Sequence, residues 1–266
     1  MSERNRFMSS SNPFLNVDHM ESASRAQMED LKSNPIDFFN NTNVANNAMT
    51  AKGAVTKTFI LTGILIVTAI FAWSLANPAL LWVGIIGGLI ASIITYVKPN
   101  IANITAPIYA AFEGLLLGTI SLFVAASMGE GFFGIVTNAI FLTIFALVAM
   151  LGAYKTGLIK PTEKFKSIVT TATLAIGMVY LVSMILSIFG ITMPYLHQGG
   201  VIGIGLSLFI VGIASLNLII DFESFETGEQ LRLDKKQEWV CAMGLLVTLV
   251  WLYLEILRLL SKINRD

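Results

Sequence analysis

The chain has 266 residues, of which 55% are hydrophobic and only 13% are charged. Soluble domains carry about 25% charged residues, so this composition predicts that lipid surrounds most of the chain. The formal net charge is zero, which argues against the basic surface that a nucleic-acid-binding protein needs. Composition therefore predicts an integral membrane protein with the lipid bilayer as a partner and no nucleic-acid partner.

Residues 1–53 differ from the rest of the chain because they are polar, rich in Asn and Ser, and poor in branched apolar side chains. Such a segment buries too little apolar surface to offset the cost of ordering, which predicts a largely disordered cytoplasmic tail. Two pieces of it are candidates for order: helix-forming residues at 21–31 and an apolar pair, Phe38 and Phe39, that could dock on the membrane surface. Residues 54–262 form the predicted transmembrane domain.

Seven apolar runs follow one another from residue 55 onward, each close to the roughly 20 residues that cross a bilayer core. No charged residue lies between Thr58 and Val97 or between Ser167 and Ile220, so these runs offer water no polar face. The sequence predicts an all-α membrane protein of seven transmembrane helices. The predicted helices lie at 55–75, 79–97, 104–127, 131–153, 168–190, 200–222 and 239–260.

The distribution of Lys and Arg among the connecting segments predicts the orientation of the bundle. Segments 76–78, 128–130 and 191–199 contain neither residue type, which predicts a cytoplasmic N-terminus and an external C-terminus. Three cations oppose the rule because they lie at the external end of the last helix. These are Arg258, Lys262 and Arg265, whereas the other connections carry Lys98, Lys155, Lys160, Lys164, Lys166, Arg232, Lys235 and Lys236.

Glu113 is a carboxylate inside an apolar run, about nine residues from the start of the helix predicted at 104–127. At 1.5 Å per residue it lies roughly 14 Å deep, near the middle of the bilayer. An unpaired charge there is costly, so the side chain must be protonated, hydrogen-bonded or exposed to a wet cavity. Glu113 is therefore a candidate for an ion or proton pathway; the alternative is a buried carboxyl group bonded to a neighbouring carbonyl.

Asp221 ends the apolar run at 200–222, and further carboxylates follow at Glu223, Glu226 and Glu238. Carboxylates that converge near one connection can bind a hard cation, and protonation abolishes such binding. Asp221 is therefore a candidate Ca²⁺ contact, and Glu238 belongs to the same candidate region. The alternative is an ordinary solvated loop whose acidic residues are compensated by lysines in the same loop.

Glu255 is the last acidic candidate and lies roughly 24 Å along the final helix from its start, on the opposite side of the membrane from Asp221. Arg258 follows it at i+3, a spacing that lets the two charges pair locally. The candidate ion-pathway or pH-sensing residues are thus Glu113, Asp221, Glu238 and Glu255.

The sequence lacks the residues that several enzymatic and cofactor-dependent functions would require. The sequence has no His-Glu-x-x-His pattern, and its two histidines, His19 and His197, lie outside the predicted helices. The last helix has no mid-span lysine that could hold retinal, and there is no Walker-type phosphate loop. We therefore expect a protein that is not an enzyme and that holds no cofactor.

Five stretches give the chain a family resemblance that runs nearly from end to end. It resembles the Bax inhibitor-1 family of transmembrane proteins, and within that family the bacterial YccA-like branch. The stretches are Ser11-Asn-Pro-Phe-Leu, Met49-Thr-Ala-Lys-Gly, Ala111-Phe-Glu-Gly, Asp221-Phe-Glu-Ser-Phe-Glu-Thr-Gly and Glu238-Trp through Leu246-Val-Thr-Leu-Val-Trp-Leu-Tyr-Leu-Glu-Ile-Leu-Arg-Leu-Leu.

The resemblance implies a bacterial inner-membrane protein in which six helices surround a central seventh. It also implies a pH-sensitive Ca²⁺ leak governed by paired aspartates on the sixth and seventh helices. Asp221 matches the first aspartate, while the position of the second falls on Glu255 or on Thr248, depending on which flanking residues are matched. Glu113 or Glu238 could also take its place.

Two further functions stay open from the sequence. The first is a non-conducting interaction protein that modulates a membrane protease or a secretion complex, as the resemblance also suggests. The second is a transporter of a small organic solute, which glycine-interrupted helices would suit.

Overall fold

The computed structural model describes residues 48–129, 132–190 and 200–265, together with residues 22, 25 and 29. The predicted helix at 21–31 and the Phe38–Phe39 pair lie outside the continuous ranges. Within those ranges the elements are α4 (Ala51–Leu75), α5 (Ala79–Val97), η2 (Pro99–Ile101), α6 (Ala102–Met128), α7 (Phe132–Lys155), α8 (Glu163–Ile188), α10 (Val201–Gln230) and α11 (Gln237–Ile263).

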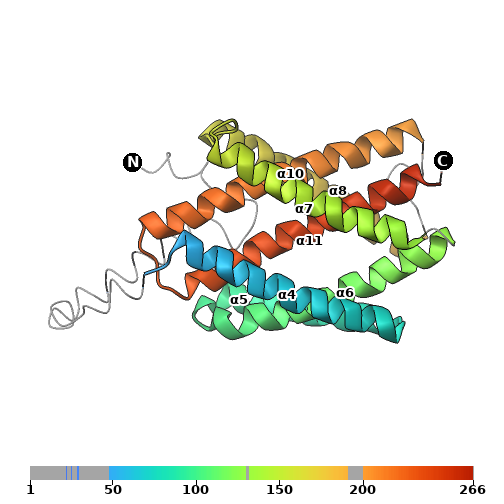
Figure 1. The fold of residues 1–266 in the computed structure, drawn as a ribbon, viewed down its shortest axis with the longest axis horizontal. Helices are drawn as coiled ribbons and strands as arrows, with labels where there is room; N and C mark the ends of the chain where they lie inside the picture. Colours follow the sequence, from blue (N-terminus) through green and yellow to red (C-terminus); the bar gives the residue numbers. More distant parts are fainter. Residues whose placement is uncertain are drawn as a thin grey trace.

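Seven of these helices are long and apolar enough to cross a membrane, which confirms the predicted all-helical, seven-span fold. The helices lie roughly along the long axis of the molecule (Figure 1). The start of α4 and the end of α11 lie at opposite ends of that axis, as an odd number of crossings requires. The protein is therefore an integral membrane protein.

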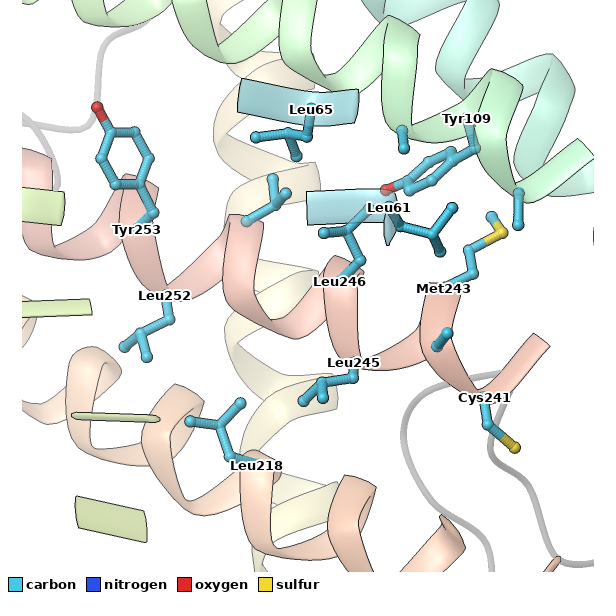
Figure 2. Packing of buried hydrophobic residues seen from close by; sticks show 14 of the residues in the cluster. Leu61, Leu65, Tyr109, Leu218, Cys241, Met243, Leu245, Leu246, Leu252 and Tyr253 are labelled. Carbon is cyan, nitrogen blue, oxygen red and sulfur yellow. The ribbon is translucent and has the colours of Figure 1, made fainter. Parts of the chain in front are cut away.

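Helix α11 is the core of the bundle. In its most apolar stretch 78% of the residues are buried, compared with 17–50% in the other spans. Helices α4, α6, α7 and α10 pack directly on it, whereas α5 packs mainly on α6. Figure 2 shows side chains of α11, including Leu245 and Leu246, between Leu218 of α10 and Leu61 of α4. A buried side chain on α11 is thus remote from lipid, and a charge there needs a partner within the protein.

The sixth span is longer than the sequence predicts, because α10 continues to Gln230 instead of ending at residue 222. Phe222 and Phe225 are buried on one side of this extension, while Glu226 is exposed on another. The acidic segment is therefore an amphipathic helical turn, and its reading as a solvated loop is wrong. Helix α8 similarly begins earlier than predicted, at Glu163, because the Thr162 side chain caps it by accepting a hydrogen bond from the amide of Phe165.

The residues before α4 are fixed to the connection between α10 and α11. The amide of Met49 donates to the carbonyl of Leu233 at 2.6 Å, and both side chains are buried. Thr50 caps α4, its hydroxyl accepting from the amide of Gly53 at 2.9 Å. Helix α4 therefore starts at Ala51, a turn before the predicted residue 55.

Glycines bring three helices into close contact. A Cβ at Gly118 of α6 would lie 2.2 Å from the carbonyl oxygen of Ala69 on α4, and a Cβ at Gly87 of α5 would meet the Phe112 ring of α6 at 2.4 Å. Gly205 of α10, by contrast, has nothing within 4 Å of that position. The close approach that glycine permits therefore joins α4, α5 and α6.

Candidate functional site

Asp221 lies inside the interface between α10 and α11 and is only 1% exposed. The Thr248 side chain of α11 lies beside the Asp221 carboxyl group, and the Thr248 hydroxyl donates to the Gly244 carbonyl of its own helix at 3.5 Å. The Asp221 Oδ2 atom is buried and has no hydrogen-bond partner among the described residues. Of the two positions that sequence matching left open opposite Asp221, the structure thus brings Thr248 to it, while Glu255 lies elsewhere.

Cys241 precedes Thr248 by seven residues on α11, a spacing that puts both on one side of the helix. The thiol is 1% exposed and lies near the carboxyl groups of Asp221 and Glu238. Small polar groups therefore follow one side of the central helix from its start at Glu238 to Thr248.

Glu238 opens α11 and is also 1% exposed, but unlike Asp221 it has a cationic partner. Its carboxylate forms an ion pair with Lys57 of α4 and accepts hydrogen bonds from the amide and hydroxyl groups of Thr50 at 3.0 and 3.2 Å. A Cβ at Gly53 would lie 2.2 Å from Glu238 Oε1, so glycine leaves the space that this carboxylate fills. Glu238 therefore ties the start of α4 to the start of α11.

The carboxylates that follow Asp221 on α10 have separate partners on other helices. Glu223 lies 2.7 Å from Nζ of Lys166 on α8, and Glu226 accepts a hydrogen bond from the Tyr154 hydroxyl of α7 at 2.6 Å. Over the described ranges, no group of three or more His, Cys, Asp or Glu side chains is arranged to hold a metal ion. The structure does not gather these carboxylates around Asp221.

Glu255 belongs to a different network, toward the far end of α11, and is 1% exposed. Its Oε1 accepts from the Tyr180 hydroxyl of α8 at 2.7 Å and from Arg258 at 2.9 Å, so the predicted i, i+3 pair is present. The Arg258 guanidinium lies 4.9 Å from the centroid of the Tyr180 ring. This network joins α8 to the central helix.

Lys262, one turn further along α11, is a buried cation. Its Nζ donates to the Gly203 carbonyl at 3.1 Å and to the Ser207 hydroxyl at 2.9 Å. Two of the three cations that oppose the positive-inside rule, Arg258 and Lys262, are therefore bound within the protein. The rule counts Lys and Arg side chains in the loops, and a cation held inside the protein is not one of these.

Glu113 of α6 lies in another part of the bundle, facing α5. It lies beside the Tyr109 hydroxyl, one turn earlier on α6. Its Oε1 is 3.4 Å from the position of a Cβ at Gly88 of α5, and its Oε2 is buried without a hydrogen-bond partner in the described ranges. Glu113 and Asp221 thus have different immediate neighbours and belong to different helix interfaces.

The partners of the candidate carboxylates were largely missed by sequence reasoning. Tyr109 could have been found, because it precedes Glu113 at i−4 and shares its helix face. Lys57 and Tyr180 lie more than 70 residues from the carboxylates they bind, and no local spacing signals such a contact.

Comparison with known proteins agrees with this architecture. Residues 12–265 match the protein family described as Bax inhibitor 1 like, a range that contains all seven described spans. No curated protein and no solved structure matches the chain. Because the family match covers nearly the whole sequence, the chain belongs to the Bax inhibitor 1-like family of polytopic membrane proteins.

Proposed function

We propose that this protein is a pH-sensitive leak pathway for cations, with Ca²⁺ as the transported ion, in a bacterial inner membrane with its N-terminus in the cytoplasm. The observation that carries the proposal is the unpartnered Oδ2 of Asp221, which is buried between α10 and the central helix. An unpaired charge in such an interior costs several kcal/mol, so a proton or a cation at Asp221 changes how α10 packs on α11.

The atoms beside Asp221 suit a hard cation. Its carboxylate oxygens and the Thr248 hydroxyl oxygen are of the ligand type that Ca²⁺ prefers. A position that offers few protein ligands binds an ion weakly. A leak requires weak binding, because an ion that binds tightly does not leave. Protons compete for the same carboxylate, and this competition makes the leak depend on pH.

The other candidate carboxylates have different roles in this proposal. Within the described ranges, Glu113 and Glu255 also each keep a buried oxygen without a hydrogen-bond partner. Glu255 is paired with Arg258, so Glu113 is the second carboxylate of the proposed pathway. Glu238 and Glu255 are neutralised by Lys57 and Arg258, so they fix the ends of α11 and are less available to a passing cation.

The test is Ca²⁺ flux into liposomes that contain the purified protein and a trapped Ca²⁺ indicator. The Glu113→Gln/Asp221→Asn double variant removes both unpaired carboxylates with little change in shape, and Glu229→Gln changes an exposed carboxylate of α10 as the matched control. We expect roughly tenfold lower flux in the double variant and wild-type flux in the control, since one lost carboxylate ligand is worth at least about 1.4 kcal/mol. Equal flux in all three proteins would exclude the leak and favour the non-conducting interaction protein.

A further inference from the structure

A groove between α8 and α10 opens on the outside of the bundle, where lipid surrounds the protein. Its walls are apolar except for one phenol hydroxyl, that of Tyr180. Ala175 at its edge is exposed, and the Phe209 side chain is 57% exposed. The lining residues are Ala172, Ala175, Ile176, Val179 and Tyr180 of α8 and Leu206, Phe209 and Ile210 of α10. The small alanine side chains leave a channel of the kind that a flexible alkyl chain can fill.

One side of α11 lies behind this groove. Trp251, Glu255, Arg258 and Lys262 recur at intervals of three and four residues, so they share one helix face. Trp251 packs with Ile176 and Ile210 of the groove walls. Tyr180 lies at the groove and also bonds to Glu255 and Arg258. The apolar groove is therefore adjacent to the Arg258 guanidinium.

This end of the groove has surplus positive charge. Arg258 and Lys262 lie near a single carboxylate, Glu255, and Lys262 is buried and bonded to α10. The Arg258 side chain is 39% exposed and can be reached from the membrane. Within the described residues both of its hydrogen bonds use Nη1. Since a guanidinium has five N–H donors, Nη2 and Nε are left for an external anion.

We infer that this groove binds an anionic phospholipid, with one acyl chain between α8 and α10 and the phosphate group on Arg258. The guanidinium and the phosphate are complementary in charge and geometry, because Arg donates paired hydrogen bonds to phosphate oxygens. Basic positions between transmembrane helices bind anionic headgroups in the same manner. The lipid offsets the surplus positive charge of Arg258 and Lys262, and its binding is independent of the proposed leak.

The experiment is native mass spectrometry of the detergent-solubilised protein titrated with phosphatidylglycerol or phosphatidylcholine of identical acyl chains. We expect the wild type to bind the anionic lipid roughly tenfold more tightly, the preference expected from one charge-assisted contact. Arg258→Gln alone leaves Glu255 buried without its cation, so the headgroup arm uses the Glu255→Gln/Arg258→Gln double variant. This variant loses the preference for the anionic lipid, whereas Arg265→Gln keeps it.

The acyl-chain arm leaves the charged network intact. Ala175→Phe fills the groove and lowers the binding of both lipids several-fold, whereas Met178→Phe, at an exposed position one turn away that does not line the groove, has no effect. Anionic preference that survives in the double variant, or equal lipid binding by the Ala175→Phe and Met178→Phe proteins, would overturn the inference. The Ala175 comparison decides the question even if the double variant does not fold.

Discussion

The side chain of Thr248 on α11 lies beside the carboxyl group of Asp221 on α10. This contact distinguishes Asp221 from Glu238 and Glu255, which are also 1% exposed but pair with Lys57 and Arg258. A hydroxyl group can satisfy part of a buried carboxyl group without neutralising it. Asp221 therefore remains the buried carboxylate of the α10–α11 interface that is open to a proton or a cation.

Thr248→Val tests this contact, because valine keeps the shape of threonine and removes the hydroxyl group. We expect the free energy of unfolding to fall by about 1–3 kcal/mol, the cost of leaving a buried polar group without its partner. The measurement is thermal unfolding in detergent. The control is Thr58→Val in α4. Among the described residues the buried Thr58 hydroxyl bonds to the Ala54 carbonyl of its own helix, as the Thr248 hydroxyl does to the Gly244 carbonyl. Equal losses in the two variants would show that the Thr248 hydroxyl has no special partner.

Lys57→Met tests the ion pair that joins α4 to α11. It leaves Glu238 buried and unpaired, so we expect a loss of about 3–5 kcal/mol in the free energy of unfolding. The Lys57→Met/Glu238→Gln double variant should recover a large part of that loss, because it removes the uncompensated charge as well. Lys52→Met, an exposed position in the first turn of α4, is the control. A double variant less stable than Lys57→Met would contradict the assignment.

Gly118→Ala tests the backbone contact between α6 and α4. The new methyl group would lie 2.2 Å from the Ala69 carbonyl oxygen, and a backbone atom cannot rotate away. We expect a loss of about 1–3 kcal/mol from overpacking. Gly63→Ala, in α4 with nothing within 4 Å of its new methyl group, should instead stabilise the protein by up to about 1 kcal/mol. Unfolding midpoints that shift in the same direction would refute the close approach.

The proposed orientation can be tested by labelling single introduced cysteines in intact cells. Cys241 gives a low background because it is buried in the central helix. Lys160→Cys lies in the connection between α7 and α8, and Asn77→Cys lies between α4 and α5. A membrane-impermeant maleimide should label the cysteine at 77 and spare the one at 160. The reverse pattern would place the N-terminus outside the cell.

The number and approximate positions of the spans could be predicted from the sequence because hydrophobic runs report directly on contact with lipid. The ends of helices could not be predicted where a helix continues through charged residues. Beyond Ile220 hydropathy falls, yet Phe222 and Phe225 keep one side of α10 buried. Periodicity, and not mean hydropathy, is the signal that would have extended this helix. The Gly114-Leu-Leu-Leu-Gly118 spacing, a known signature of close helix packing, would likewise have predicted the contact with α4.

The candidate carboxylates could be predicted because a charge in an apolar run is costly and therefore conspicuous. Their partners depend on how each helix is rotated about its axis, which a single sequence does not specify. Depth along the helix was sufficient to separate Glu255 from Asp221, and the structure joins Glu255 to Tyr180 and Arg258. Depth could not show that Glu113 faces Gly88 on α5, because that depends on helix rotation.

The central claim is that Asp221 makes the leak respond to protons, and the most direct measurement is Ca²⁺ flux at mildly acidic and mildly alkaline pH. Proteoliposomes containing wild type, Asp221→Asn or Glu229→Gln are compared at equal protein density. We predict a several-fold difference in flux between the two pH values for the wild type and for Glu229→Gln, and none for Asp221→Asn. An Asp221→Asn protein whose flux changes with pH as much as that of the wild type would contradict the proposal.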